Sequence, residues 1–169
     1  IGVGILSAAL KKDALSADGY QQMIATTTKL NKPGIALANL AGVHALTDVT
    51  GFGLAGHLLE ICRGSQLSAS VRFADLPLIS EAVGFVQEGV STGASTRNWN
   101  GYGADVSLPA GAPEWQQKLL TDPQTSGGLL VACAPETAQA VLAELHGAGF
   151  AEACAIGRMQ AGAPVLQVT

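Results

Sequence analysis

One acidic residue, Asp48, stands where an apolar segment meets a glycine-rich turn in the run HALTDVTGFGLAGHLLE. Mg²⁺ takes oxygen ligands, and proteins often supply only one or two carboxylates while water and substrate phosphates provide the rest. A single carboxylate at the end of a strand can therefore hold such an ion when other parts of a protein complete its ligands. Gly51 and Gly53 allow a tight turn and a close approach of the backbone to a ligand. The helix expected behind them would direct free N–H groups at an anion.

An ordinary turn explains the same residues without a ligand. An Asp before Thr-Gly often hydrogen-bonds to nearby backbone N–H groups, and on spacing alone this interpretation comes ahead of metal binding. His57 lies beside the apolar face of its expected helix, three residues before Glu60. This place favours a hydrogen-bonded histidine at the edge of the core over a metal ligand. A zinc site is not indicated, because it needs about four Cys or His ligands and these residues are few and scattered.

A second polar, glycine-rich segment, TDPQTSGGLLV, occupies residues 121–131. The hydroxyl groups of Thr125 and Ser126 could form a polar lip beside a pocket. Gly127 and Gly128 would let the backbone approach a ligand closely just before an apolar strand. Taken alone, the segment is better explained as the start of a strand, where the glycines make the backbone flexible.

A third segment, STRNWNGYG, lies within residues 89–103, the longest stretch without periodicity, and is expected to be a loop. Arg97 could hold a phosphate with two hydrogen bonds, and Trp99 or Tyr102 could stack on a base. A solvated surface loop explains the segment equally well. The chain contains no GxxxxGK[ST], no GxGxxG after a strand, no nucleophile elbow and no HExxH. A self-contained nucleotide-hydrolysing or serine-hydrolase site is therefore excluded.

The elements that must position these residues follow from periodicity, caps and turn residues, with Ser16 as one expected N-cap. Helices are expected at Ser16–Asn31, at Ile35–Ala41 after a break at Pro33-Gly34, at Gly53–Arg63, at Ile79–Glu88, at Pro113–Leu120 and from Pro135 onwards. Strands are expected at Ile1–Ala9, in the approach to Asp48, at Leu67–Phe73, at 129–134 as a central strand covered on both faces, at 153–159 and at 164–168. This mixture predicts an α/β or α+β layered domain.

Composition limits the classes of protein that fit. With 169 residues, 48% of them hydrophobic and 13% charged, the chain can form one domain around a buried core. A net charge of -4 argues against nucleic acid as a partner, which would need a basic surface. No apolar run of about 18 residues and no signal peptide is present, so neither a membrane span nor secretion is indicated. The cysteines are expected to be reduced thiols in a cytoplasmic protein.

Together the two glycine-rich motifs resemble those of selenophosphate synthetase (selenide, water dikinase). LTDVTGFGLAGHLLE and LTDPQTSGGLLV occur here in the same order, and the similarity extends from the opening IGVGILSAA to AIGRM near the end. The resemblance corresponds to the C-terminal half of that enzyme. The wider superfamily includes aminoimidazole ribonucleotide (AIR) synthetase, thiamine-monophosphate kinase and a hydrogenase maturation protein. The TGFG and DPQTSGG motifs are more similar to the selenium branch.

The resemblance implies an α/β (α+β) fold, a mixed β-sheet with helices packed on it. It also implies that residues 1–169 are a single domain, the C-terminal half of a longer two-domain enzyme. A chain that opens at Ile1 without an initiator Met is consistent with this expectation. Full-length members of the family dimerise largely through the other half.

The activity implied is the conversion of selenide, ATP and water to selenophosphate, AMP and phosphate, with ATP and Mg²⁺ bound between the two halves. By position in the motif, Asp48 is the implied Mg²⁺ ligand. The implied wall of the nucleotide and phosphate cleft consists of Gly51, Gly53, Thr125, Ser126, Gly127 and Gly128.

No catalytic residue is expected in this chain. Cys62, Cys133 and Cys154 match no nucleophile position of the family, whose Cys or selenocysteine belongs to the other half. The family's GGTxRN-like run reads GASTRN here, so Arg97 and Asn98 match while their contact with ligand stays open. The isolated chain is expected to be inactive and to bind ATP poorly. Another ATP-dependent enzyme of the superfamily and a non-catalytic interaction domain on the same scaffold are the alternatives.

Overall fold

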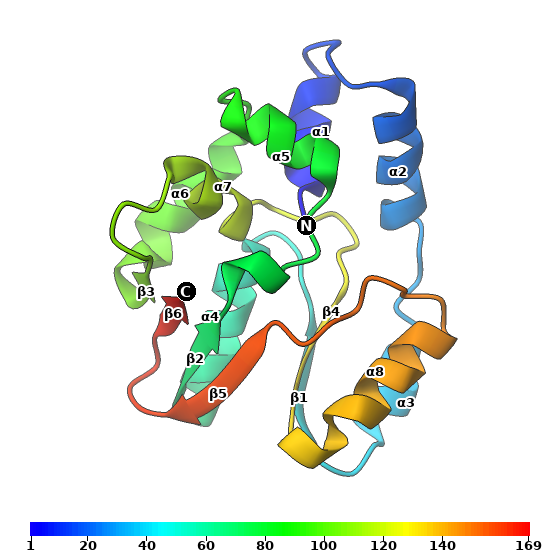
Figure 1. Ribbon diagram of the computed structural model, residues 1–169, viewed down its shortest axis with the longest axis vertical. Helices are drawn as coiled ribbons and strands as arrows, with labels where there is room; N and C mark the ends of the chain where they lie inside the picture. The colour runs from blue at the N-terminus through cyan, green and yellow to red at the C-terminus, as the bar shows by residue number, and fades with distance from the viewer.

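The computed structural model describes residues 1–169 and contains two β-sheets with helices packed around them (Figure 1). The helices are α1 (Val3–Leu10), α2 (Ala17–Thr27), α3 (Pro33–Ala38), α4 (Gly53–Ser65), α5 (Ser80–Gln87), α6 (Gly93–Tyr102), α7 (Glu114–Leu120) and α8 (Ala138–Gly147). The strands are β1 (Val43–Asp48), β2 (Leu67–Val71), β3 (Val106–Ser107), β4 (Leu129–Cys133), β5 (Gly157–Ala161) and β6 (Leu166–Val168). Single turns of 3-10 helix lie at Phe73–Asp75, Gly103–Asp105 and Pro135–Thr137. The predicted mixed α/β fold is confirmed.

The smaller sheet consists of β1 and β4, which run antiparallel along the middle of the molecule (Figure 1). Their register pairs Asp48 with Leu129 and Val43 with Cys133. The end of β1 therefore lies beside the start of β4. This pairing brings together two motifs that are far apart in the sequence.

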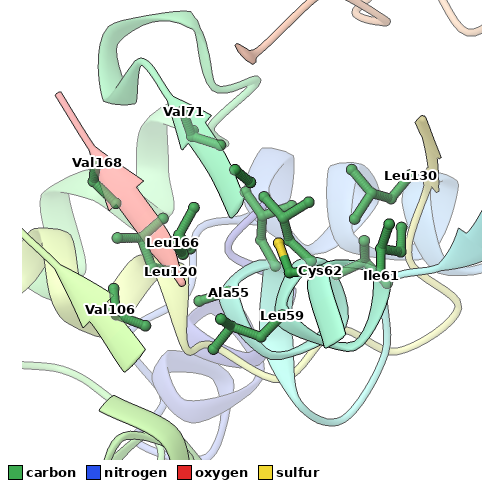
Figure 2. Close-up of a cluster of buried hydrophobic side chains, with 14 of the residues drawn as sticks. Ala55, Leu59, Ile61, Cys62, Val71, Val106, Leu120, Leu130, Leu166 and Val168 are labelled. Carbon is green, nitrogen blue, oxygen red and sulfur yellow. The ribbon is translucent and has the colours of Figure 1, made fainter. Parts of the chain in front are cut away.

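The larger sheet has the strand order β3-β6-β2-β5, with β5 antiparallel to β2 and the other neighbours parallel. Alternate side chains of β2 and β6 point into the main hydrophobic core, where Val71, Leu166 and Val168 are almost completely buried. Leu59 and Cys62 of α4 meet them from the other side (Figure 2). Helix α4 thus packs on the larger sheet, and its N-terminus is held in a fixed position.

Two smaller hydrophobic clusters lie at opposite ends of the molecule. Helices α1, α5 and α7 pack together at one end, and α3 packs with α8 at the other (Figure 1). Leu129 and Val131 of β4 contact the α3–α8 cluster, whereas Leu130 belongs to the main core. Strand β4 is therefore covered on both faces, as predicted. It pairs only with β1, so the prediction that it is a central strand is wrong.

Most of the predicted helices are confirmed. Helix α2 begins after Ser16, whose hydroxyl accepts a hydrogen bond from the Gly19 amide at 2.9 Å. The helices expected near α4, α5, α7 and α8 are present within a few residues of their predicted ends. Helix α3 begins at Pro33 itself, because proline fits the first helical position. No helix of this structure is long and apolar enough to cross a membrane.

Two element predictions are wrong. The segment Ile1–Ala9, expected to be a strand, forms helix α1, which is buried on most sides and therefore lacks the alternation of polar and apolar residues that marks an exposed helix. The segment 89–103, expected to be a loop, contains helix α6. The hydroxyl of Thr92 caps α6 by accepting from the Ser95 amide at 3.1 Å.

Candidate functional site

The two glycine-rich motifs form adjacent loops where β1 ends and β4 begins. The amide of Val49 donates to the carbonyl of Gly128 at 2.9 Å, and the amide of Gln124 donates to the carbonyl of Thr50 at 2.9 Å. One loop leads directly into α4, and the other leads into β4. The predicted site residues of both motifs are therefore brought to one place.

The carboxylate of Asp48 is exposed at the last residue of β1. Its backbone pairs with Leu129 in the sheet, while its side chain forms no hydrogen bond or ion pair with the rest of the chain. The simple turn interpretation, in which this carboxylate binds neighbouring amides, is not what the structure shows. No three His, Cys, Asp or Glu side chains gather into a metal-binding group. The chain thus offers one free carboxylate here, and a cation held by it would need further ligands from elsewhere.

The turn between Asp48 and α4 directs its carbonyl groups into the protein. The carbonyl of Thr50 accepts from the amide of Gly53 at 3.0 Å as well as from Gln124. The carbonyl of Gly51 accepts from the side-chain amide of Asn98 at 2.9 Å, and that of Phe52 accepts from the hydroxyl of Tyr102. The amides of residues 50–52 have no acceptor within the chain. Together with the start of α4, they form a surface that favours an anion.

The predicted wall glycines fall into two kinds. Gly53 has φ +69°, and a Cβ there would lie 2.7 Å from the carbonyl carbon of Thr121. A Cβ on Gly127 would lie 2.0 Å from the carbonyl oxygen of Val49. These two glycines are required by packing. Gly51 and Gly128 face open space, since a Cβ on either residue would have no heavy atom within 4 Å.

The hydroxyl-bearing residues of the second motif line the same loop. The side chains of Thr125 and Ser126 are exposed and form no hydrogen bond within the chain. Ser126 has φ +48°, a left-handed conformation that turns the backbone before β4. The amides of residues 125–128 also have no acceptor within the chain. The two hydroxyl groups are therefore exposed and free on this loop, and their role as a polar lip beside a pocket stays a prediction.

Two residues of the second motif have a role that sequence reasoning missed. The buried carboxylate of Asp122 accepts from the amides of Gly4 at 2.9 Å and Ile5 at 3.3 Å. The side-chain carbonyl of Gln124 accepts from the amides of Gly2 and Val3, both at 3.2 Å. Both side chains therefore cap α1. Because their partners lie more than a hundred residues away in the sequence, no local pattern could reveal them.

The environment of Asp122 is unusual for a carboxylate. Burial raises its pKa to about 6, although the side chain of Gln124 and the amides of Ile5 and Gly4 favour the charged form. One oxygen accepts these hydrogen bonds, while the other is buried without any partner. Asp122 is thus held next to the site without reaching its surface.

Helix α6 contacts both loops through Asn98. The side-chain amide of Asn98 donates to the carbonyl of Gly51 at 2.9 Å and to the carbonyl of Thr121 at 3.0 Å. The hydroxyl of Ser95 lies 2.6 Å from that of Thr121 and donates to the carbonyl of Lys118 at 3.1 Å. Two residues of the GASTRN segment, Ser95 and Asn98, therefore position the motifs. Arg97 is exposed and forms no ion pair.

The proposed stacking residues of the third segment are used inside the fold. Trp99 and Tyr102 are half-buried against the main hydrophobic core. Burial raises the pKa of the Tyr102 hydroxyl, and this group donates to the carbonyl of Phe52. The suggestion that Trp99 or Tyr102 stacks on a base is not supported by this packing.

The histidine of the first motif is buried and hydrogen-bonded, as predicted for the edge of the core. Only 7% of His57 is exposed. Its Nε2 lies 3.1 Å from the hydroxyl of Thr50, and its Nδ1 lies 3.1 Å from the carboxylate of Glu60. A chain of three side chains thus ends at the turn beside Asp48.

The three cysteines are free thiols. Cys62 is buried in the main core, Cys133 is half-buried and Cys154 is exposed. Burial raises the pKa of all three thiols, and nearby carboxylates raise those of Cys133 and Cys154 further. A raised pKa disfavours the nucleophilic thiolate. The absence of a catalytic cysteine from this chain stays a prediction.

Comparison with known proteins gives the chain a family. Residues 1–168 match the family model described as AIR synthase related protein, C-terminal domain. A protein of Paraburkholderia xenovorans named selenide, water dikinase is 61% identical over 162 residues, which are 96% of this chain and 46% of that protein. A protein of Burkholderia pseudomallei with the same name is 62% identical over 169 residues, 100% of this chain and 48% of the relative. The chain therefore spans about half the length of the curated relatives it matches.

A solved structure shows the same fold at low sequence identity. The crystal structure of the hydrogenase maturation protein HypE aligns with a TM-score of 0.62 and 21% identity, and covers 95% of this chain and 41% of that chain. The resemblance expected from the two motifs is confirmed, since the relatives named above carry the name it suggested. The chain belongs to the family of AIR synthase related proteins, to whose C-terminal domain its residues 1–168 correspond.

Proposed function

We propose that residues 1–169 are the C-terminal domain of a selenide, water dikinase and supply one wall of its ATP and metal cleft. The reaction would convert selenide, ATP and water to selenophosphate, AMP and phosphate. The main support is the meeting of both motif loops beside an exposed, unpartnered carboxylate, Asp48. The names of relatives that are 61% and 62% identical point to the same activity.

In this proposal Asp48 is a ligand of Mg²⁺. Its exposure and its freedom from other hydrogen bonds fit such a role, and Mg²⁺ commonly takes only one or two protein carboxylates. The other ligands of this ion would come from ATP phosphates and from an N-terminal half. A bound Mg²⁺ would offset the charge of the transferred phosphoryl group.

The phosphates of ATP would lie against the two loops. Gly51 and Gly128 leave open space where a ligand can approach the backbone, and the amides of residues 50–52 and 125–128 are free to donate hydrogen bonds. The exposed hydroxyls of Thr125 and Ser126 would add further donors. Gly53 and Gly127 would shape the wall through the close packing described above.

The remaining parts of the proposal concern the whole enzyme. The partners would be an N-terminal half that carries the nucleophile, ATP and selenide, with a homodimer formed by the full-length protein. The location would be the cytoplasm, where ATP and a reducing environment are found. The isolated chain would be inactive, because most of the ligands for ATP and metal would belong to the other half.

The full-length enzyme that contains this chain tests the proposal. Formation of AMP from ATP should depend on added selenide and on Mg²⁺. ATP turnover that instead depends on a thiamine phosphate or on an aminoimidazole precursor would assign the chain to another branch of the superfamily. A full-length protein that does not turn over ATP with any of these substrates would indicate a non-catalytic interaction domain.

A further inference from the structure

The hydroxyl of Thr50 is held by two side chains of α4 that the proposed function does not use. His57 Nε2 lies 3.1 Å from Thr50 Oγ1, and His57 Nδ1 lies 3.1 Å from Glu60 Oε2. The side chain of His57 is 9% exposed, whereas that of Glu60 is 54% exposed. The three groups form a chain that runs from the surface of α4 to the turn beside Asp48.

The chemistry of these groups determines the donor and the acceptor in each of the two hydrogen bonds of His57. A carboxylate such as Glu60 only accepts hydrogen bonds, so the facing Nδ1 of His57 carries the proton. In the neutral imidazole Nε2 is then an acceptor, and the hydroxyl of Thr50 donates its hydrogen to it. Thr50 Oγ1 is left with lone pairs for a second partner. It therefore presents an acceptor, which suits a cation or water bound to a cation and does not suit a phosphate oxygen.

Thr50 follows Asp48 by two residues, at the start of the turn that leads into α4. Val49, the residue between them, is 6% exposed and belongs to the main core. The pairing with the second motif continues past β1, since the amide of Val49 donates to the carbonyl of Gly128 and the amide of Gln124 donates to the carbonyl of Thr50, both at 2.9 Å. Side chains two residues apart on an extended segment point to the same side, which is the basis for grouping the half-buried Thr50 with Asp48. A carboxylate and a hydroxyl oxygen are both hard oxygen donors of the kind that Mg²⁺ takes.

We propose that Thr50 is a second oxygen ligand, directly or through one water, of the divalent cation that Asp48 holds. His57 and Glu60 are positioning residues that keep the hydroxyl turned as an acceptor. This inference rests on the proposed function and adds a specific ligand to the same site. Similar side chains behind metal ligands in other proteins fix the orientation of the ligand and strengthen metal binding by about 10- to 100-fold.

The first test measures Mn²⁺ binding to the full-length enzyme by electron paramagnetic resonance of the free ion. Thr50→Val keeps the shape of the side chain and removes the hydroxyl, so the Kd for Mn²⁺ should rise about tenfold. Thr50→Ser restores the hydroxyl and should bind Mn²⁺ like the wild type. Thr28→Val is the matched control, because the hydroxyl of Thr28 donates to the Ile24 carbonyl at 2.8 Å, at the C-terminal end of α2. Equal Kd values for Thr50→Val and wild type would overturn the inference.

The second test asks whether His57 acts through Thr50. His57→Leu should raise the Kd for Mn²⁺ by a similar factor, and the double variant with Thr50→Val should be no weaker than either single variant. His146→Leu is the control, since His146 contacts the carbonyl of Ala153 at 2.8 Å outside the site. Nitrogen NMR of the neutral His57 ring should show the proton on Nδ1. A proton on Nε2, or independent effects of the two substitutions, would contradict the proposed orientation.

Asp48→Asn separates failure of this inference from failure of the proposed function. If Asp48→Asn weakens Mn²⁺ binding while Thr50→Val and His57→Leu do not, Asp48 remains a ligand and the inference fails. If Asp48→Asn leaves Mn²⁺ binding unchanged, the proposed metal role of the chain fails. If Thr50→Val raises only the KM for ATP, the hydroxyl contacts the nucleotide and the inference is wrong.

Discussion

Gly127 has no room for a side chain, because a Cβ would lie 2.0 Å from the carbonyl oxygen of Val49. Gly51, in the neighbouring loop, has open space around it and no left-handed backbone. The sequence shows both simply as glycines of a turn. Only the packing distinguishes a glycine that the fold needs from one that leaves space for something outside the chain.

Substitution by alanine should separate these two glycines. Gly127→Ala should lower the free energy of unfolding by about 2 to 3 kcal/mol, because backbone atoms must move apart. Gly51→Ala should change it by less than about 0.5 kcal/mol, while the KM for ATP of the full-length enzyme rises. Urea unfolding and steady-state kinetics measure these effects. A stable Gly127→Ala variant would show that the loops are not packed as described.

Asp122 should make stability depend on pH. Burial raises its pKa in the folded protein to about 6, from an ordinary value of 3.8. The protonated form therefore favours folding, and its contribution is complete below pH 3.8 and is lost as the pH rises through about 6. The free energy of unfolding can fall by about 3 kcal/mol over this pH range. Asn keeps an acceptor for the amides of α1 and does not ionise.

The measurement is urea unfolding of wild type and Asp122→Asn between pH 4 and pH 7. The stability of Asp122→Asn relative to wild type should increase across this range, because only the wild type must bury a charge at the higher pH. If the difference in free energy of unfolding between the two proteins stays constant with pH, burial does not raise the pKa of Asp122.

At the level of elements, α6 connects both motif loops although its sequence carries no helical periodicity. Its residues are mostly polar, and its helical state depends on the Thr92 cap and on packing against α4 and α7. The amphipathic helices α2, α4 and α8 were predictable because one face of each is apolar. Helix α1 differs from the predicted strand, because it is buried on most sides and its caps come from residues 122 and 124, far along the chain.

Removal of the Asn98 side chain should loosen this connection. Asn98→Ala loses two hydrogen bonds, to Gly51 and Thr121, and should lower the free energy of unfolding by about 1 to 2 kcal/mol. It should also raise the KM for ATP of the full-length enzyme. Asn100→Ala, an exposed position on the same helix, should change stability by less than about 0.5 kcal/mol. Equal behaviour of the two variants in thermal unfolding would contradict the bridging role.

At the scale of the whole molecule, the sequence predicted the mixed fold, and the two motifs singled out by their resemblance to a family form adjacent loops in the structure. The free state of the Asp48 carboxylate, the Asn98 bridge and the capping of α1 could not be predicted, because each depends on contacts between distant segments. The chain covers about half of its relatives' length. In the proposed function, the chain supplies one wall of a cleft.

The isolated chain should therefore bind ATP weakly and release no AMP in the presence of selenide and Mg²⁺. Isothermal titration with ATP and a chromatographic assay for AMP measure this, and the full-length enzyme is the positive control. Rapid ATP turnover by residues 1–169 alone would show that the chain holds a complete site.

The central claim is that the carboxylate of Asp48 binds the divalent cation used with ATP. The most direct measurement is Mn²⁺ binding together with selenide-dependent AMP formation by full-length Asp48→Asn, with the exposed Asp13→Asn as the matched control. Asp48→Asn should raise the Kd for Mn²⁺ and lower AMP formation, each by at least about tenfold, while thermal unfolding and the control stay like the wild type. Unchanged Mn²⁺ binding and AMP formation in Asp48→Asn would contradict the claim.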